Sequence, residues 1–152
     1  MKIMIPHVEA RSLTAYKTYT PTMIRAIQTV FRLLRVRDKS EISLVIVGEK
    51  RMRELNKRWR NKDSVTDVLS FGLWKLDLPL EKKISEITHV GEIVICIAYA
   101  KKQARILSVS LSQILTLLAA HGAIHLAGID HERSKKEERL TEHIQKSVLQ
   151  KI

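Results

Sequence analysis

The sequence predicts an α/β or α+β fold in which helices pack on a single small mixed β-sheet. Segments with the length and apolar composition of strands alternate with amphipathic helical segments through about two thirds of the 152 residues, and helical segments follow. Alternation of this kind is typical of a sheet covered by helices. A chain of this length is expected to form one domain, residues 1–152, that buries about 68–70% of its unfolded surface.

The first predicted elements are an edge strand and a helix. Residues 1–12 can form a strand, and Pro6 within them lacks the amide hydrogen that pairing on both sides requires. A helix is expected from Thr20, with Thr20 as the N-cap and Pro21 in the first turn. Apolar residues then recur at helical spacing, namely Ile24, Ile27, Phe31 and Leu34.

Three strands are expected in the middle of the chain. Residues 41–48 and 90–98 are apolar at successive positions, which is typical of strands that are buried on both faces. Residues 64–72 form the third predicted strand, and residues 73–88 are expected to form a loop or a weak strand. A short helix is predicted over residues 99–107.

A strongly basic helix is expected near residues 50–62, with the sequence KRMRELNKRWRNK. Met52, Leu55 and Trp59 share one helical stripe, so we expect all three to face the core. A role of Trp59 in stacking on a nucleic-acid base is the less favoured alternative. Seven basic residues and a single acid, Glu54, occupy the other positions. They indicate either a binding surface or a helix that its charges keep soluble.

Two helices are predicted in the last third. The first, residues 111–127, begins with a capping box formed by Ser110 and Gln113. It is apolar almost all round, which is typical of a helix at the centre of a fold. The second begins at Lys135 and is amphipathic, with an inward stripe of Leu140, Ile144 and Val148.

The central helix carries a cluster of histidines. His121 and His125 lie four residues apart and therefore share a helix face. Gly128 can adopt the left-handed conformation that ends a helix, and the chain can then return His131 to the pair. Three neutral imidazoles would leave one position open on zinc or a similar ion, as in a catalytic site. The alternative is a set of histidines that binds no metal.

Two neighbouring residues bear on the chemistry of this cluster. Gly122 stands where the H-E-x-x-H motif of zinc proteases has its general base, and this disfavours a protease. Asp130 can either orient a ligand imidazole or cap the turn after Gly128, and the sequence favours neither role.

Charge and cysteine content indicate partners and compartment. Residues 1–62 hold 15 Lys and Arg against 5 Asp and Glu, whereas residues 63–152 are nearly balanced, and the whole chain carries +11. This asymmetry favours a polyanion on one face. The single cysteine, Cys96, fits a reducing compartment. No apolar run reaches about 18 residues and the N-terminus lacks the apolar core of a signal peptide, so we expect a cytoplasmic protein without a membrane segment.

Three blocks of sequence resemble one known family. HGAIHLAGIDHE (121–132) resembles the H-G-x-x-H-L-x-G-x-D-H signature of the YbeY family of bacterial metallo-endoribonucleases, which take part in ribosomal RNA maturation. LNKRWRNKDSVTDVLSFG (55–72) is similar to the family's L-N-x-x-Y-R-x-K-D-x-P-T-D-V-L-S-F-P, and GEIVIC (91–96) to its G-D-I-V-I-S strand. The resemblance covers most of residues 41–145. The departures are mild: Trp59 replaces a tyrosine, Val65 and Gly72 replace prolines, and Ile129 replaces a tyrosine.

The resemblance implies a site and a reaction. His121, His125 and His131 would hold one zinc ion per chain, and Arg60 falls on the family's functionally important arginine. The protein would be a single-strand-specific endoribonuclease that acts in maturation of the small-subunit ribosomal RNA 3′ end and in ribosome quality control. Zinc would activate a water molecule or polarise the phosphate, and Arg60 would stabilise the charge.

The expected partners are single-stranded RNA, ribosomal RNA and the small ribosomal subunit, and the protein is expected to be a monomer. Lys57, Arg58 and Lys62 are the expected RNA-binding residues. Two other classes remain open at this stage: a ribosome-assembly factor with a structural metal, and a zinc hydrolase of another substrate such as a peptide.

Overall fold

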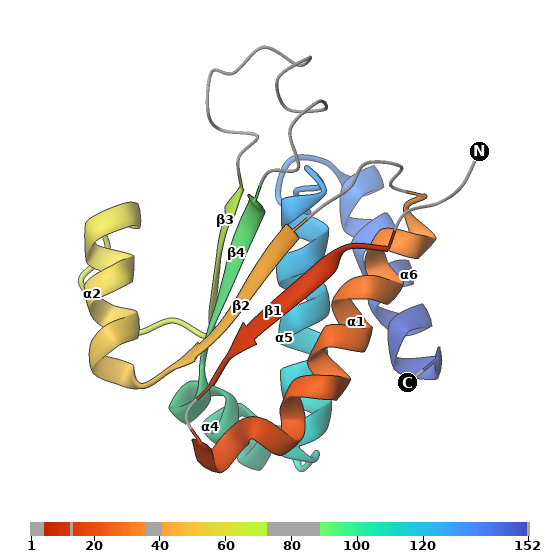
Figure 1. Ribbon diagram of the computed structural model, residues 1–152. Coiled ribbons are helices and arrows are strands. Elements are labelled where there is room, and N and C mark those ends of the chain that lie inside the picture. The colour runs from red at the N-terminus through yellow and green to blue at the C-terminus, as the bar shows by residue number, and fades with distance from the viewer. Residues whose placement is uncertain (1–4, 13, 36–40, 73–88, 152) are drawn as a thin grey trace.

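A four-stranded mixed sheet with the order β1-β2-β4-β3 organises the molecule (Figure 1). The computed structural model describes residues 5–12, 14–35, 41–72 and 89–151, so the predicted loop at 73–88 lies outside the described residues. Strands β1, β2 and β4 are parallel, and β3 is an antiparallel edge strand on β4. Their bounds are His7–Arg11 for β1, Glu41–Val47 for β2, Val68–Gly72 for β3 and His89–Cys96 for β4.

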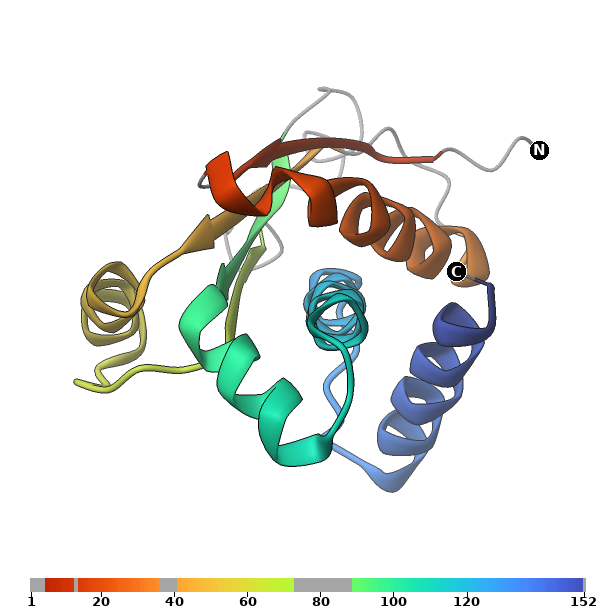
Figure 2. The ribbon, with the colours of Figure 1, turned by 90° about the horizontal axis from the view of Figure 1, so that it is seen from below.

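Helices cover both faces of this sheet, as the predicted α/β class requires. Figure 2 shows α5 in the middle of the larger layer, with α1, α4 and α6 around it and the sheet beside it. Helix α2 packs on the opposite face of the sheet (Figure 1). The helices are η1, a 3-10 helix at Thr14–Tyr19, α1 (Thr20–Leu33), α2 (Glu49–Arg60), α4 (Ile97–Leu107), α5 (Leu111–Leu126) and α6 (Lys135–Lys151).

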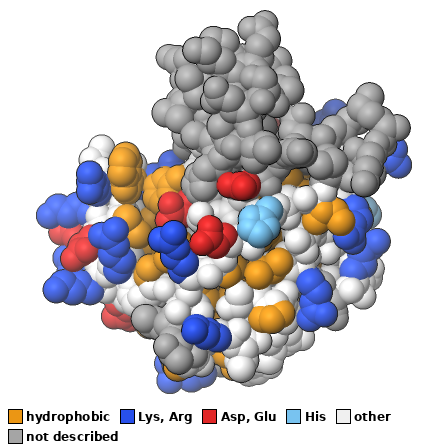
Figure 3. Space-filling model, in the orientation of Figure 1, with side chains coloured by type: hydrophobic (Ala, Val, Ile, Leu, Met, Phe, Trp, Pro, Cys, Tyr) orange, Lys and Arg blue, Asp and Glu red, His pale blue; other side chains and the backbone are white. Residues whose placement is uncertain are grey.

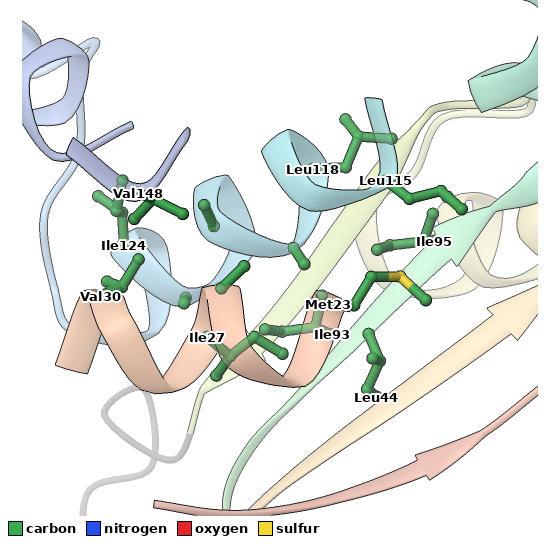
Figure 4. Close-up of a cluster of buried hydrophobic side chains, with 14 of the residues drawn as sticks. Met23, Ile27, Val30, Leu44, Ile93, Ile95, Leu115, Leu118, Ile124 and Val148 are labelled. Carbon is green, nitrogen blue, oxygen red and sulfur yellow. The ribbon is translucent and has the colours of Figure 1, made fainter. Parts of the chain in front are cut away.

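Successive side chains of β4 point to opposite faces of the sheet, and they contribute to two separate apolar clusters. Ile93 and Ile95 belong to the cluster under α1 and α5, whereas Val94 and Cys96 belong to the cluster under α2. Figure 4 shows the larger cluster, in which side chains from β2 and β4 meet those of α1 and α5. The prediction that a strand with apolar residues on both faces lies inside the sheet is therefore confirmed for β4.

Helix α5 is as buried as its apolar sequence predicts. The predicted capping box is present: the Ser110 hydroxyl accepts from the Gln113 amide, and the Gln113 side-chain oxygen accepts from the Ser110 amide, each at 3.1 Å. Two glycines allow close packing on the sheet. A Cβ at Gly91 would lie 2.6 Å from the carbonyl oxygen of Phe71, and a Cβ at Gly122 would lie 2.8 Å from Ile93 Cγ2.

Several local predictions were wrong. Thr20 does not cap α1, because the chain enters the helix directly from η1 and Tyr19 already has helical dihedral angles. Leu140 is 38% exposed, while Thr141 is buried and donates its hydroxyl to the carbonyl oxygen of Glu137 at 2.8 Å. Strand β3 begins only at Val68, so residues 64–67 of the predicted strand precede it as a loop, although the Asp67 carbonyl oxygen already accepts the Cys96 amide hydrogen of β4 at 2.9 Å.

Trp59 is also misplaced by the sequence-based prediction. Met52 is fully buried and Leu55 half-buried, as expected of a core-facing stripe. Trp59, however, is 58% exposed, because it lies in the last turn of α2, beyond the edge of the apolar cluster. Its indole lies edge-on to the Phe71 ring, with 6.1 Å between the ring centroids.

Among the described residues, no single helix is both long and apolar enough to cross a membrane. Helices α4 and α5 would reach that length and composition only as a pair, and they meet at a bend of 118°.

We predict that Gly122→Ala destabilises the protein although alanine favours helix. The gain in helix propensity is about 0.5–1 kcal/mol, while overpacking a close contact costs about 1–3 kcal/mol. The new methyl group would meet Ile93, a β-branched side chain in a full core that has no room to move. We expect a net loss of about 1 kcal/mol in the free energy of unfolding from urea titration. Gly48→Ala is a control without a steric clash, because nothing lies within 4 Å of its Cβ, and it should lose only the preference of the α2 N-cap for glycine over alanine. Wild-type stability or a gain in Gly122→Ala would contradict the packing explanation.

Candidate metal centre

The last two turns of α5 present two imidazoles on one face. His121 and His125 are four residues apart, and their ring centroids lie 4.7 Å apart. Their Nε2 atoms approach to 3.1 Å. The opposite side of this helix is buried against the sheet, so the core holds the backbone that carries both rings.

A helix-ending turn brings His131 to the pair. The amide of Ile129 donates to the carbonyl oxygen of Ile124 at 3.3 Å, and that of Gly128 donates to the carbonyl oxygen of His125 at 3.0 Å. This hydrogen-bond pattern is the Schellman motif, and Gly128 supplies its left-handed residue with a φ of 88°. The prediction of a glycine-ended helix and a returning chain is confirmed.

Polar contacts hold the returning chain in place. The Asp130 carboxylate accepts the amide hydrogen of Glu132 at 2.9 Å, so the structure places Asp130 in the turn rather than on a ligand ring. Arg133 donates to the carbonyl oxygen of Gly128 at 2.7 Å and pairs with Glu137 of α6 at 2.8 Å. These contacts are exposed and add little stability, but they define the geometry of the turn.

The three histidines have the geometry that a metal site requires. One ring nitrogen from each of His121, His125 and His131 lies within 4.8 Å of the others, and all three side chains are half-buried. Two nitrogens bound to one tetrahedral zinc ion stand roughly 3.3 Å apart, which the 3.1 Å between His121 and His125 approaches. In addition, His131 Nδ1 is buried without a hydrogen-bond partner in the described part of the chain. The donor set therefore fits a borderline metal such as zinc.

Burial also keeps two of these imidazoles neutral. Loss of solvent, together with the neighbouring His125 and His131, lowers the pKa of His121 to about 4. Burial likewise lowers the pKa of His125, assisted by His131 and by the Arg60 cation and opposed by Asp130. Metal ligation requires the unprotonated ring, so His121 and His125 are in their binding form at neutral pH.

The triad faces a cleft of about 730 Å³ that also receives Arg60. Arg60 is the last residue of α2, which Asn61 ends in the left-handed conformation. Its guanidinium donates to the carbonyl oxygen of Ser70 at 2.7 Å and lies over the Phe71 ring, 5.6 Å from the centroid. The structure thus brings Arg60 from the far face of the sheet over the edge strand β3 to the side of the histidines.

The other predicted RNA-binding residues lie on the surface of α2 and in the turn that follows it. Lys57, Arg58 and Lys62 are all exposed, and none of them lines the cleft. The Arg58 guanidinium lies over the Trp59 indole, 5.1 Å from its centroid. Figure 3 shows several Lys and Arg side chains on the α2 side of the molecule, with acidic side chains among them and others nearer the centre.

The cleft contains residues that the sequence did not single out. Gln145 of α6 lies 2.9 Å from Nδ1 of His121, and the Ser70 hydroxyl donates to the carbonyl oxygen of Gly122 at 3.2 Å. Asp67 also lines the cleft. Its negative charge raises the pKa of His121, opposite to the effects of burial and of the two neighbouring histidines. Gln145 follows His121 by 24 residues on a different helix, so no local spacing could have indicated the contact. Ser70 and Asp67 lie within the block 55–72 quoted above, which was the available signal.

Fold and site together define a small α/β protein in which three histidines, His121, His125 and His131, could bind a metal ion. The model of the Endoribonuclease YbeY family matches residues 7–152, and the chain belongs to this family. The family membership expected from the three sequence blocks is confirmed.

Individual relatives agree with this assignment. Endoribonuclease YbeY of Persephonella marina is 34% identical over 129 residues, which cover 84% of this chain and 79% of the relative. Endoribonuclease YbeY of Leptospira interrogans is 41% identical over 110 residues, which cover 66% and 78%. A solution structure of a protein from Thermotoga maritima aligns over 97% of this chain and 91% of its own with a TM-score of 0.58; at 22% identity it supports the fold alone.

We predict that His121 makes the metal-free protein less stable as the pH falls from about 6.5 towards 4. The pKa of His121 is about 4 in the folded chain and about 6.5 when unfolded, so the unfolded state binds more protons in this window. Stability is therefore retained above pH 6.5 and lost as the pH falls through the window. The measurement is the urea midpoint of chelator-treated protein at several pH values. His121→Gln should flatten its pH dependence, whereas the exposed His143→Gln should not; equal slopes would contradict the assignment.

Proposed function

We propose that this chain is a zinc-dependent endoribonuclease, specific for single strands, that acts in the cytoplasm on ribosomal RNA during maturation of the small-subunit 3′ end. The observation that carries the proposal is the convergence of three imidazoles and one arginine in a single cleft. Family membership supports RNA cleavage as the reaction.

In this reaction the three histidines would bind the ion and Arg60 would bind the phosphate. His121, His125 and His131 hold the ion and leave one side of it open to the cleft. Bound zinc supplies a Lewis acid for a phosphoryl oxygen and can lower the pKa of a coordinated water to about 7. Arg60 is fixed by one hydrogen bond to Ser70 and keeps its remaining donors for a phosphate. Its planar guanidinium can stabilise charge that develops on the phosphoryl oxygens.

The exposed end of α2 supplies a surface for the rest of the strand. Lys57, Arg58 and Lys62 can neutralise phosphates of the RNA backbone without fixing its sequence. Trp59 offers an exposed aromatic face, and Phe71 and Arg58 hold it from two sides. Stacking of an unpaired base on this indole would select single strands, because the faces of paired bases are covered in a duplex.

We predict that His125→Ala lowers zinc content by about tenfold or more and abolishes RNA cleavage. Two imidazoles leave the ion with too few protein ligands, so loss of metal should accompany loss of activity. Zinc per chain and cleavage of a single-stranded RNA are the measurements, with His143→Ala as the control on an exposed histidine. Full zinc occupancy in His125→Ala would exclude that ligand. Loss of the fold together with the metal would instead indicate a structural site.

For Arg60 we predict that the conservative variant Arg60→Lys loses about tenfold or more in kcat/KM. Lysine keeps the charge but loses the fork that can bind Ser70 and a phosphate at once. Arg51→Lys is the matched control, because Arg51 lies on the same helix, is exposed and, within the described ranges, pairs with Glu54 alone at 3.4 Å. Equal kcat/KM values for Arg60→Lys and the wild type would show that only charge is needed at this position.

A salt titration of RNA binding should distinguish the contribution of the positive charges on α2 from that of base stacking on Trp59. Each phosphate contact contributes about −0.7 to the slope of log K against log salt for a single strand. Replacing both Lys57 and Lys62 by Gln should therefore flatten the slope by about 1.4. Trp59→Ala should weaken binding by about 1–3 kcal/mol at every salt concentration and leave the slope unchanged.

Trp59→Phe is the control for that titration, since it keeps an aromatic face and should retain part of the affinity. Arg58 stays unchanged throughout because it packs over the Trp59 ring. Wild-type affinity in Trp59→Ala would exclude a stacking role. A wild-type slope in the double lysine variant would place the RNA backbone elsewhere.

A further inference from the structure

Gln145 contacts His121, and the proposed reaction assigns no role to this contact. Its side-chain amide lies 2.9 Å from Nδ1 of His121, the ring atom that faces away from the other two histidines. Ile144 and Val148 on either side of it are buried in the main core, so α6 holds this amide in a fixed place. Gln145 also lines the cleft.

The contact determines which nitrogen of His121 carries the proton. When the amide nitrogen of Gln145 faces the ring, it donates to Nδ1, so the ring proton must be on Nε2. That proton then points at His125 Nε2, 3.1 Å away, which accepts it. A hydrogen-bonded chain from Gln145 through His121 to His125 results, and it satisfies all three groups without a metal.

The opposite orientation of the same amide prepares the ring for ligation. A rotation of the terminal amide by about 180° turns its oxygen towards the ring, and that oxygen accepts a proton from Nδ1. The lone pair of Nε2 is then directed into the centre, 3.1 Å from that of His125. The exchange moves one proton from Nε2 to Nδ1 and requires no movement of the backbone.

We propose that Gln145 is a positioning residue that selects the tautomer of His121, donating to Nδ1 in the metal-free protein and accepting from it in the metal-bound protein. An amide serves both forms because it carries a donor and an acceptor on one planar group, whereas a carboxylate would only accept. Partners of this kind commonly fix the tautomer and the orientation of ligating histidines. The proposal rests on metal binding by the triad, but its first readout needs no metal.

Two variants and one control test it. Gln145→Glu keeps the length of the side chain but only accepts, and Gln145→Leu removes both functions at similar volume. Gln150→Leu is the control, because Gln150 lies on the same helix and is exposed. The measurements are the ¹⁵N chemical shifts of the His121 ring nitrogens at pH 7.5 in metal-free protein, and the zinc affinity of each variant from competition with a chelating dye.

In metal-free wild type and Gln150→Leu we expect His121 to carry its proton on Nε2. Gln145→Glu should carry it on Nδ1 already before metal is added, and should bind zinc at least as tightly as wild type. Gln145→Leu should lose about 10–100-fold in zinc affinity, the usual effect of removing such a partner. If Gln145→Leu does not fold, wild type and Gln145→Glu still give the tautomer result.

The proposal is overturned if metal-free wild type and Gln145→Glu have the same tautomer, or if Gln145→Leu binds zinc as tightly as Gln150→Leu. A tautomer change in Gln145→Glu combined with no zinc binding by wild type would have a different meaning. It would support the role of Gln145 on the ring and refute the metal centre, so failure of the two proposals can be distinguished.

Discussion

The burial of α5 between the sheet and α1, α4 and α6 is the constraint on which the site depends (Figure 2). Close contact at Gly122 and Gly91 leaves the helix no freedom to slide or rotate on β3 and β4. The position of His121 and His125 is therefore set by the packing of the core and not by the histidines themselves. The Schellman turn then extends this rigidity by a few residues and so fixes His131 as well.

The burial of α5 also determines the protonation state of His121 and His125. Removing water from the rings disfavours the imidazolium form and lowers the pKa of His121 and His125, so the ligands are neutral without help from an acid. An ion placed beside His121 and His125 therefore meets no competing proton on these two rings at neutral pH. Arg60 places a positive charge in the cleft wall close to His125, and Arg133 lines the same cleft.

The sequence predicted those features that depend on local pattern. The apolar patterns predicted the strands and the buried helix α5. The capping box predicted the start of α5 at Ser110, and Gly128 predicted its end. Features set by tertiary contacts were missed. Trp59 keeps helical spacing with Met52 but extends beyond the sheet that would cover it. Thr141 replaces Leu140 in the core by bonding to its own helix, and Gln145 reaches His121 from a helix whose packing angle no sequence period encodes.

X-ray absorption at the zinc edge of the loaded protein tests the metal centre most directly. Three imidazole nitrogens from α5 and its exit turn should appear at about 2.0–2.1 Å, together with one ligand from solvent or substrate that lacks the multiple scattering of an imidazole ring. In His131→Ala, measured at a zinc concentration high enough to fill the weakened site, the imidazole contribution should fall from three rings to two, while the fold, set by α5, remains. A shell without imidazole scattering, or an unchanged spectrum in His131→Ala, would contradict a centre built from His121, His125 and His131.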